Sequence, residues 1–201
     1  MNRTEITIQK YQLRFDELNA IKSTIYEPEG FLKLPYEQAK RKFEECLFWF
    51  YVDGFSSGVL MTGEDTPMPN GYEFLDIRYP DGETVEEKFR KHFEGGNAEK
   101  LATLMDSEAH RMWNTGTMAS AGAEIDKETG IPSASTGKPL KKTWRTMMDE
   151  KVRDQHWMLE GKTIPMDEEF VTADGDYGLA PGMFQTAENN ANCRCILLLG
   201  R

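Results

Sequence analysis

The last quarter of the chain holds the side chains best suited to chemistry. Cys193 and Cys195 flank Arg194 in a Cys-x-Cys pair, which places two soft sulfur ligands on one short segment, and His156 precedes them. Thiolate sulfur and imidazole nitrogen are the ligands that zinc prefers, and a cysteine beside a histidine can also form a nucleophile and its base. The spacing therefore indicates either a zinc site or a catalytic pair.

A tetrahedral zinc site needs a fourth ligand, for which Asp149 or a water molecule is the candidate. The segment from Asp149 to His156 is predicted to form a helical turn. On a helix, Asp149, Arg153 and His156 follow the spacing i, i+4, i+7 and project from one face. We expect Asp149 and Arg153 to form an ion pair, and one of them to fix the orientation of the imidazole.

A purely structural interpretation of the same residues stays open. Two small buried thiols can anchor a terminal strand, predicted over 195–199, while His156 hydrogen-bonds to nearby backbone. Arg194 between the sulfurs would then lower the pKa of the thiols without any metal.

The order of residues around the cluster resembles the phage Mu protein F-like family of minor head, or head morphogenesis, proteins. The resemblance runs from Lys141 to Leu199, with a weaker match over 101–123. In addition to the residues above, the positions that match the characteristic ones of the family are Trp144, Arg153, Gly161, Phe170, Pro181 and Asn192.

The resemblance implies a low-copy virion protein of a tailed phage or prophage. Such a protein associates with the portal or the inner capsid during head assembly, takes part in DNA packaging or ejection, and is assembled in the bacterial host cytoplasm. The alternative is an enzyme or toxin-like domain with a Cys/His centre, either a hydrolase or similar to an ADP-ribosyltransferase. The sequence shows no separate oxyanion motif and no glycine pattern for nucleotides, which weighs against the enzyme.

The pattern of elements predicts an α+β fold. Residues 1–96 form a helical N-terminal region with a hairpin-rich connector, and residues 97–201 form a compact α+β head morphogenesis domain with its motif core at 141–199. Helices are expected from Pro35 to a break near Gly54, after Thr84 with an incomplete capping box, and from about Asn97 to Thr117. The first residues are expected to form a short extended arm that leads into a helix.

The composition limits the kinds of molecule that the protein is expected to bind. A formal charge of −10 repels phosphate backbones, so generic nucleic-acid binding is not expected, although Lys138, Lys141, Lys142 and Arg145 form one local basic group. No apolar run is long enough to cross a membrane, and the first residues lack the apolar stretch of a signal peptide. The three cysteines do not suggest a disulfide framework.

The aromatic run around Phe48, Trp49 and Phe50 covers more than one face of its predicted helix. All of it can lie in an ordinary core. We favour the alternative, in which these three residues anchor a partner protein in the phage head.

Overall fold

The computed structural model describes residues 2–64, 66–69, 74–79, 81–133 and 140–200. Its α-helices are α1 (Arg3–Ser23), α2 (Tyr36–Thr62), α3 (Val85–Glu94), α4 (Ala98–Ser120), α5 (Asp154–Trp157) and α6 (Ala187–Asn190), and its 3-10 helices are η1 (Thr24–Tyr26), η2 (Phe31–Lys33) and η3 (Phe74–Asp76). The strands are β1 (Lys141–Thr146), β2 (Thr163–Pro165), β3 (Phe170–Val171), β4 (Tyr177–Gly178) and β5 (Cys195–Gly200). The fold is α+β, as predicted.

The N-terminal segment is helical from Arg3, so the expected extended arm is wrong. The side chain of Asn2 accepts a hydrogen bond from the backbone of Glu5, and the Glu5 carboxylate accepts one from the backbone of Asn2. This reciprocal capping box pairs backbone N–H groups that a helix end otherwise leaves without acceptors. It therefore stabilises a helix that begins directly after Asn2.

Helix α2 continues through Gly54, where a break was expected, and ends at Gly63 with a positive φ of 70°. A Cβ atom on Gly54 would lie 2.0 Å from the carbonyl oxygen of Trp113, and one on Gly116 would lie 2.1 Å from that of Tyr51. These glycines therefore let α2 and α4 approach at backbone distance instead of ending the helix.

The segment between α2 and α3, for which a loop or a hairpin-rich connector was expected, is mostly loop in its described residues. Over its described residues, 63–64, 66–69, 74–79 and 81–84, it contains the short helix η3 and one isolated bridge, between Arg78 and Thr84. The capping box of α3 is complete, because Glu87 is the third residue after the cap Thr84 and the two exchange hydrogen bonds. The expectation of an incomplete box was wrong.

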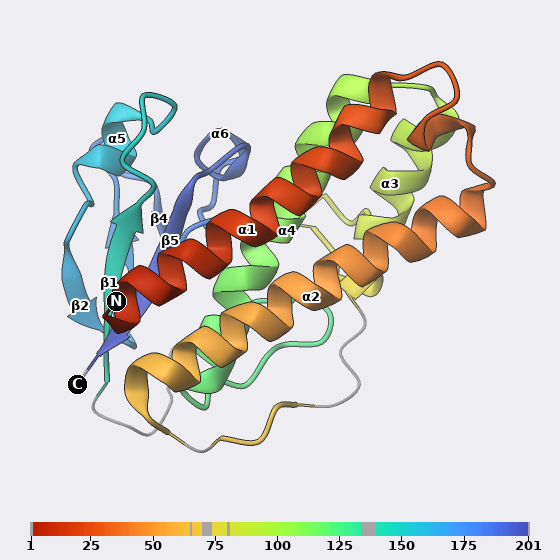
Figure 1. Cartoon of the computed structure of the whole chain (residues 1–201). Helices are drawn as coiled ribbons and strands as arrows, with labels where there is room; N and C mark the ends of the chain where they lie inside the picture. Colours follow the sequence, from red (N-terminus) through yellow and green to blue (C-terminus); the bar gives the residue numbers. More distant parts are fainter. Residues whose placement is uncertain (1, 65, 70–73, 80, 134–139, 201) are drawn as a thin grey trace.

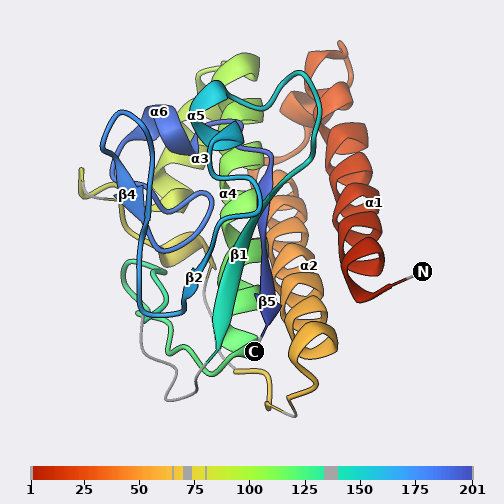
Figure 2. The same ribbon diagram turned by 90° about the vertical axis from the view of Figure 1, so that its left-hand side faces the viewer.

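The sheet lies beside the long helices. Strands β2, β1 and β5 form an antiparallel sheet in that order, with Trp144 opposite Leu197 and Thr146 opposite Cys195. Helices α1, α2 and α4 run alongside one another, and the sheet packs at the side where β5 touches α2 and α4 (Figures 1 and 2). Helix α4, which begins at its predicted cap Asn97, packs against both α2 and β5.

Two hydrophobic cores share helix α4. The first joins apolar side chains of α1 to α4 and includes Ile196 of β5. The second lies around Trp144 and Phe170 and includes Met118 near the end of α4, together with Cys193 and Cys195. The division of the chain at 96/97 stays a prediction, since α4 contributes to both cores.

Each of the long helices carries charged residues, as in the stretch Lys40-Arg41-Lys42 of α2. Within the described part of the chain, no helix combines the length and the apolar character needed to span a membrane.

Candidate metal centre

The structure brings His156, Cys193 and Cys195 together in the second core. The imidazole Nδ1 lies 3.6 Å from the sulfur of Cys193 and 3.6 Å from that of Cys195. The three potential ligand atoms all lie within 4.8 Å of one another. Each of the three residues is at most 2% exposed, so the group is enclosed by protein.

Neighbouring rings fix the imidazole of His156. The Trp144 ring meets it edge to face at 5.4 Å between centroids, the Phe184 ring stacks on it at 5.7 Å, and the two rings also contact each other at 5.6 Å. Helix α5 supplies the histidine, and β5 together with the residues before it supplies the cysteines. The orientation of the ring is thus set by packing, and its Nδ1 is directed at both sulfurs.

Asp149 and Arg153 do not have the predicted roles. Helix α5 begins only at Asp154, so Asp149 does not share a helical face with His156. The Asp149 carboxylate pairs instead with Arg194, at 2.6 Å, and Arg153 donates a hydrogen bond to the carbonyl of Ala191. Among the described residues, the group of ligand atoms does not include Asp149.

The two thiols differ strongly in acidity. Burial raises the pKa of Cys195 far above its ordinary value, and the neighbouring Cys193 raises it further. Burial acts in the same direction on Cys193, but hydrogen bonds from Cys195, His110 and His156 and the charge of His110 outweigh it and hold its pKa well below the ordinary value.

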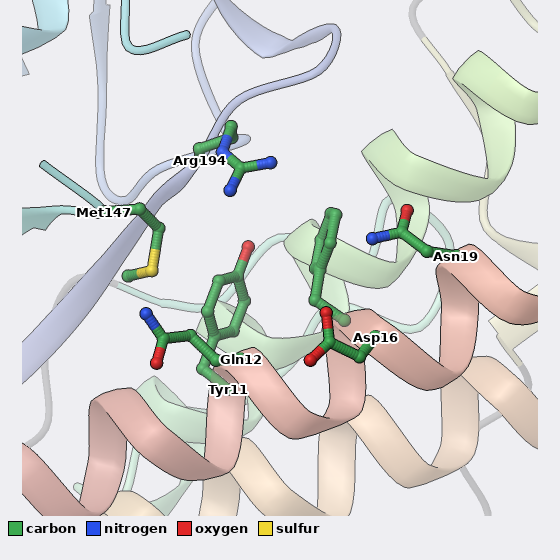
Figure 3. A pocket seen from close by; sticks show the side chains of 7 residues that line it. Tyr11, Gln12, Asp16, Asn19, Met147 and Arg194 are labelled. Carbon is green, nitrogen blue, oxygen red and sulfur yellow. The ribbon is translucent and has the colours of Figure 1, made fainter. Parts of the chain in front are cut away.

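Sequence reasoning missed the contribution of α1 to this region. The Tyr11 hydroxyl lies 2.9 Å from Nδ1 of His110, and both side chains are buried. Figure 3 shows Tyr11 extending from α1 toward the segment that carries Arg194, where the two line a small pocket of about 50 Å³. Nothing in the local sequence around Tyr11 signals this contact, because 99 residues separate it from His110.

Asn114 is a second residue that the sequence did not single out. Its fully buried amide donates to the carbonyl of Pro181, and its oxygen accepts the backbone N–H of Leu197 at 2.9 Å. One side chain near the middle of α4 thus holds both the loop at 181 and strand β5. The signal was a polar residue on the apolar face of a predicted helix.

The remaining motif residues shape the backbone and the core around the centre. Gly161 and Asn192 both have positive φ angles, 73° and 52°, a conformation that glycine and asparagine tolerate best. Phe170 is fully buried against Trp144, at 5.1 Å between ring centroids. Pro181 is buried and supplies the carbonyl that Asn114 binds.

The three proposed interaction residues separate into two environments. Phe50 is fully buried in the first core, so it cannot anchor a partner. Phe48 and Trp49 are 40% and 42% exposed, and their rings contact each other at 5.3 Å. The exposed aromatic surface of α2 therefore consists of these two side chains.

The chain is similar in sequence to two characterised proteins. The chain is 36% identical to minor head protein GP7 of Bacillus phage SPP1 over 92 residues, which are 46% of this chain and 27% of that protein. It is 30% identical to NAD(+)--arginine ADP-ribosyltransferase EFV of Enterococcus faecalis over 109 residues, 51% of this chain and 22% of that protein. It spans about a quarter of the length of these relatives.

No solved structure matches the chain significantly. The family described as phage Mu protein F like protein matches residues 81–198, a range that includes α4, the sheet and the cluster of His156, Cys193 and Cys195. This range is more than half of the chain, and the chain therefore belongs to the phage Mu protein F-like family.

Proposed function

We propose that this protein is a low-copy minor head protein of a tailed phage or prophage, which joins the portal or the inner capsid during head assembly. The observation that carries this proposal is the family match over residues 81–198, together with a relative named minor head protein. The proposal includes a place in the virion and a part in DNA packaging or ejection.

The burial of the Cys/His centre supports a structural role. A catalytic nucleophile or base must touch its substrate, whereas His156, Cys193 and Cys195 are enclosed in the second core. The similarity to EFV favours, as a second function, a domain attached to a toxin-like transferase. The enclosed centre suits an assembly domain in either case, and we rank the head protein first.

We propose Phe48 and Trp49 as part of the surface that holds the protein in the head. Large aromatic side chains that remain exposed on a folded domain are typical anchors at protein interfaces. Arg14 lies over the Trp49 ring, 5.6 Å from its centre, and leaves the indole 42% exposed. The ring is therefore held on the surface of α2 while one side stays free for a partner.

The test is co-assembly with the portal and capsid proteins of the same phage genome. Trp49→Ala should lower the amount of this protein that co-sediments with the particles, because it removes an anchor. It should change the melting temperature little, since the side chain is 42% exposed. Trp157→Ala is the matched control, as Trp157 is 37% exposed on α5 and should leave co-sedimentation unchanged.

Phe50→Ala separates binding from folding, because it empties a fully buried position and should destabilise the protein by about 3 to 5 kcal/mol. Wild-type protein that never co-sediments with portal or capsid would contradict the proposed function. Equal losses for Trp49→Ala and Trp157→Ala would contradict only the assignment of the surface.

A further inference from the structure

We propose that His156, Cys193 and Cys195 bind a zinc ion that fixes strand β5 against α5 and the rest of the second core. This inference rests on the side chains of this chain and is independent of the proposed role in the phage head.

The distances fit zinc. Zinc bonds of about 2.3 Å to sulfur and 2.05 Å to nitrogen, at tetrahedral angles, separate a sulfur from a nitrogen ligand by about 3.6 Å. Both sulfur-to-Nδ1 distances here are 3.6 Å. Both sulfur-to-nitrogen distances therefore already match the corresponding edges of a zinc tetrahedron, and the three ligand atoms all lie within 4.8 Å of one another.

Hydrogen bonds alone do not explain why both sulfurs lie equally close to Nδ1 of His156. The Nδ1 atom of a neutral imidazole has either one N–H or one lone pair, so it forms one good hydrogen bond, yet two sulfurs lie at the same distance from it. A zinc ion among the three atoms bonds to all of them at once. Zinc binds cysteine as the thiolate, and its two positive charges offset the charges of both buried sulfurs.

The surroundings suit a structural ion. The three ligands come from two separate segments, α5 and residues 193–195, so a bound ion cross-links them. Trp144 and Phe184 contact the imidazole, and each of the three ligand residues is at most 2% exposed. The three protein ligands leave the fourth position of the tetrahedron to a water molecule. The nearest acidic candidate, Asp149, is paired with Arg194.

Soft sulfur ligands and a tetrahedral spacing select zinc over the hard cations. Calcium and magnesium take oxygen ligands in larger numbers, and the group contains none. The inference is therefore specific to a thiophilic divalent ion.

The experiment measures metal in the full chain, expressed in zinc-supplemented medium and purified without chelator. Elemental analysis should find about one zinc ion per chain, and replacement by Co²⁺ should give the ultraviolet thiolate-to-cobalt band and the intense visible bands of a tetrahedral site. A strong chelator should lower the melting temperature of the wild type, because the binding energy of the metal is part of the folding energy.

Matched variants locate the site. Cys195→Ser and His156→Ala should lose most of the zinc, whereas Cys46→Ser and His92→Ala should keep it, because neither residue belongs to the group. The cobalt spectrum of the wild type keeps the test valid if a ligand variant fails to fold. Metal-free wild type without a cobalt band, or a Cys193–Cys195 disulfide found by mass spectrometry in protein purified under reducing conditions, would overturn the proposal.

Discussion

Lys142 lies in the core, although its charge suggests a surface position. The sequence placed it in a basic group with Lys138, Lys141 and Arg145, but its side chain is fully buried and donates a hydrogen bond to the carbonyl of Met166. Its ammonium also lies 5.7 Å from the centre of the Phe170 ring. Lys138 lies outside the described residues, so the basic group retains Lys141 and Arg145 among those that the structure places.

The pKa of Lys142 leads to a prediction about pH. Burial lowers the pKa from 10.5 to about 8, although Glu169 and Asp167 act in the opposite direction. The folded state therefore disfavours the charged form. Below pH 8 the lysine is charged in both the folded and the unfolded state, so folding carries the full cost of burying the charge. This cost decreases above pH 8 and disappears near pH 10.5, where the unfolded state also loses the proton. Lys142→Met should raise the free energy of unfolding at pH 7, and the gain should vanish near pH 10.5.

Denaturant unfolding of the wild type and the variant across this pH range measures the difference. Lys141→Met is the matched control, because Lys141 is the exposed neighbour in the same strand and should show no such pH dependence. A constant difference between the wild type and Lys142→Met at all pH values would mean that the buried ammonium is not the cause.

At the scale of elements, the contact between α2 and α4 depends on the missing side chain of Gly116. In an isolated helix, replacing glycine with alanine stabilises by about 1 kcal/mol. Here the new Cβ would lie 2.1 Å from the carbonyl oxygen of Tyr51, so the two backbones must separate. We predict that Gly116→Ala lowers the free energy of unfolding by about 2 kcal/mol or more.

Thermal and denaturant unfolding test this prediction. Ser107→Ala, a change to the same residue at a half-buried position on α4, should have a small effect. If Gly116→Ala were as stable as the wild type, the close approach of α2 and α4 would be wrong.

The elements that the sequence predicted well are those whose signals are local. The cap at Asn97 and the apolar run after Cys195 mark α4 and β5 without reference to the rest of the chain. Gly54 is needed because Trp113 of another helix packs against it, and this contact cannot be seen in the local sequence. Glycine also often ends helices, so a helix break was predicted there. Asp149 was placed on a helix, but its pairing with Arg194 favours a turn.

In the candidate metal centre, too, the sequence predicts local features but not contacts between distant residues. The Cys-x-Cys spacing and His156 are visible in sequence because their chemistry is distinctive. The contribution of Tyr11 is not visible, and a polar residue on an apolar helical face is the only signal for Asn114, because the partners of both residues lie far away along the chain. Whether the centre binds zinc stays a prediction.

For the whole molecule, charge determines the expected behaviour with DNA. The net charge of −10 gives a repulsive average field toward a duplex. Several basic side chains are also paired with acids, as in the pairs of Arg14 with Asp53, Lys22 with Asp106 and Arg194 with Asp149. We predict binding to duplex DNA weaker than the roughly 10⁻⁴ to 10⁻⁶ M typical of non-specific binding at physiological salt.

Fluorescence anisotropy with a labelled duplex, repeated at two salt concentrations, measures this affinity. Binding in the submicromolar range that weakens steeply with salt would contradict the prediction. It would show that Lys141, Arg145 and their neighbours form an effective patch despite the net charge.

Strand β5 has a consequence for how the protein folds as it is made. Its Ile196 completes the first core and its Leu197 the second, and Leu199 hydrogen-bonds to the sulfur of Met61 across 138 residues. Bringing together segments so far apart costs loop entropy and slows folding. While the ribosome is still adding the residues before 195, one edge of β1 has no partner strand and both cores are incomplete. At that stage the nascent chain exposes an unpaired strand edge and apolar side chains, which favours aggregation and binding by chaperones.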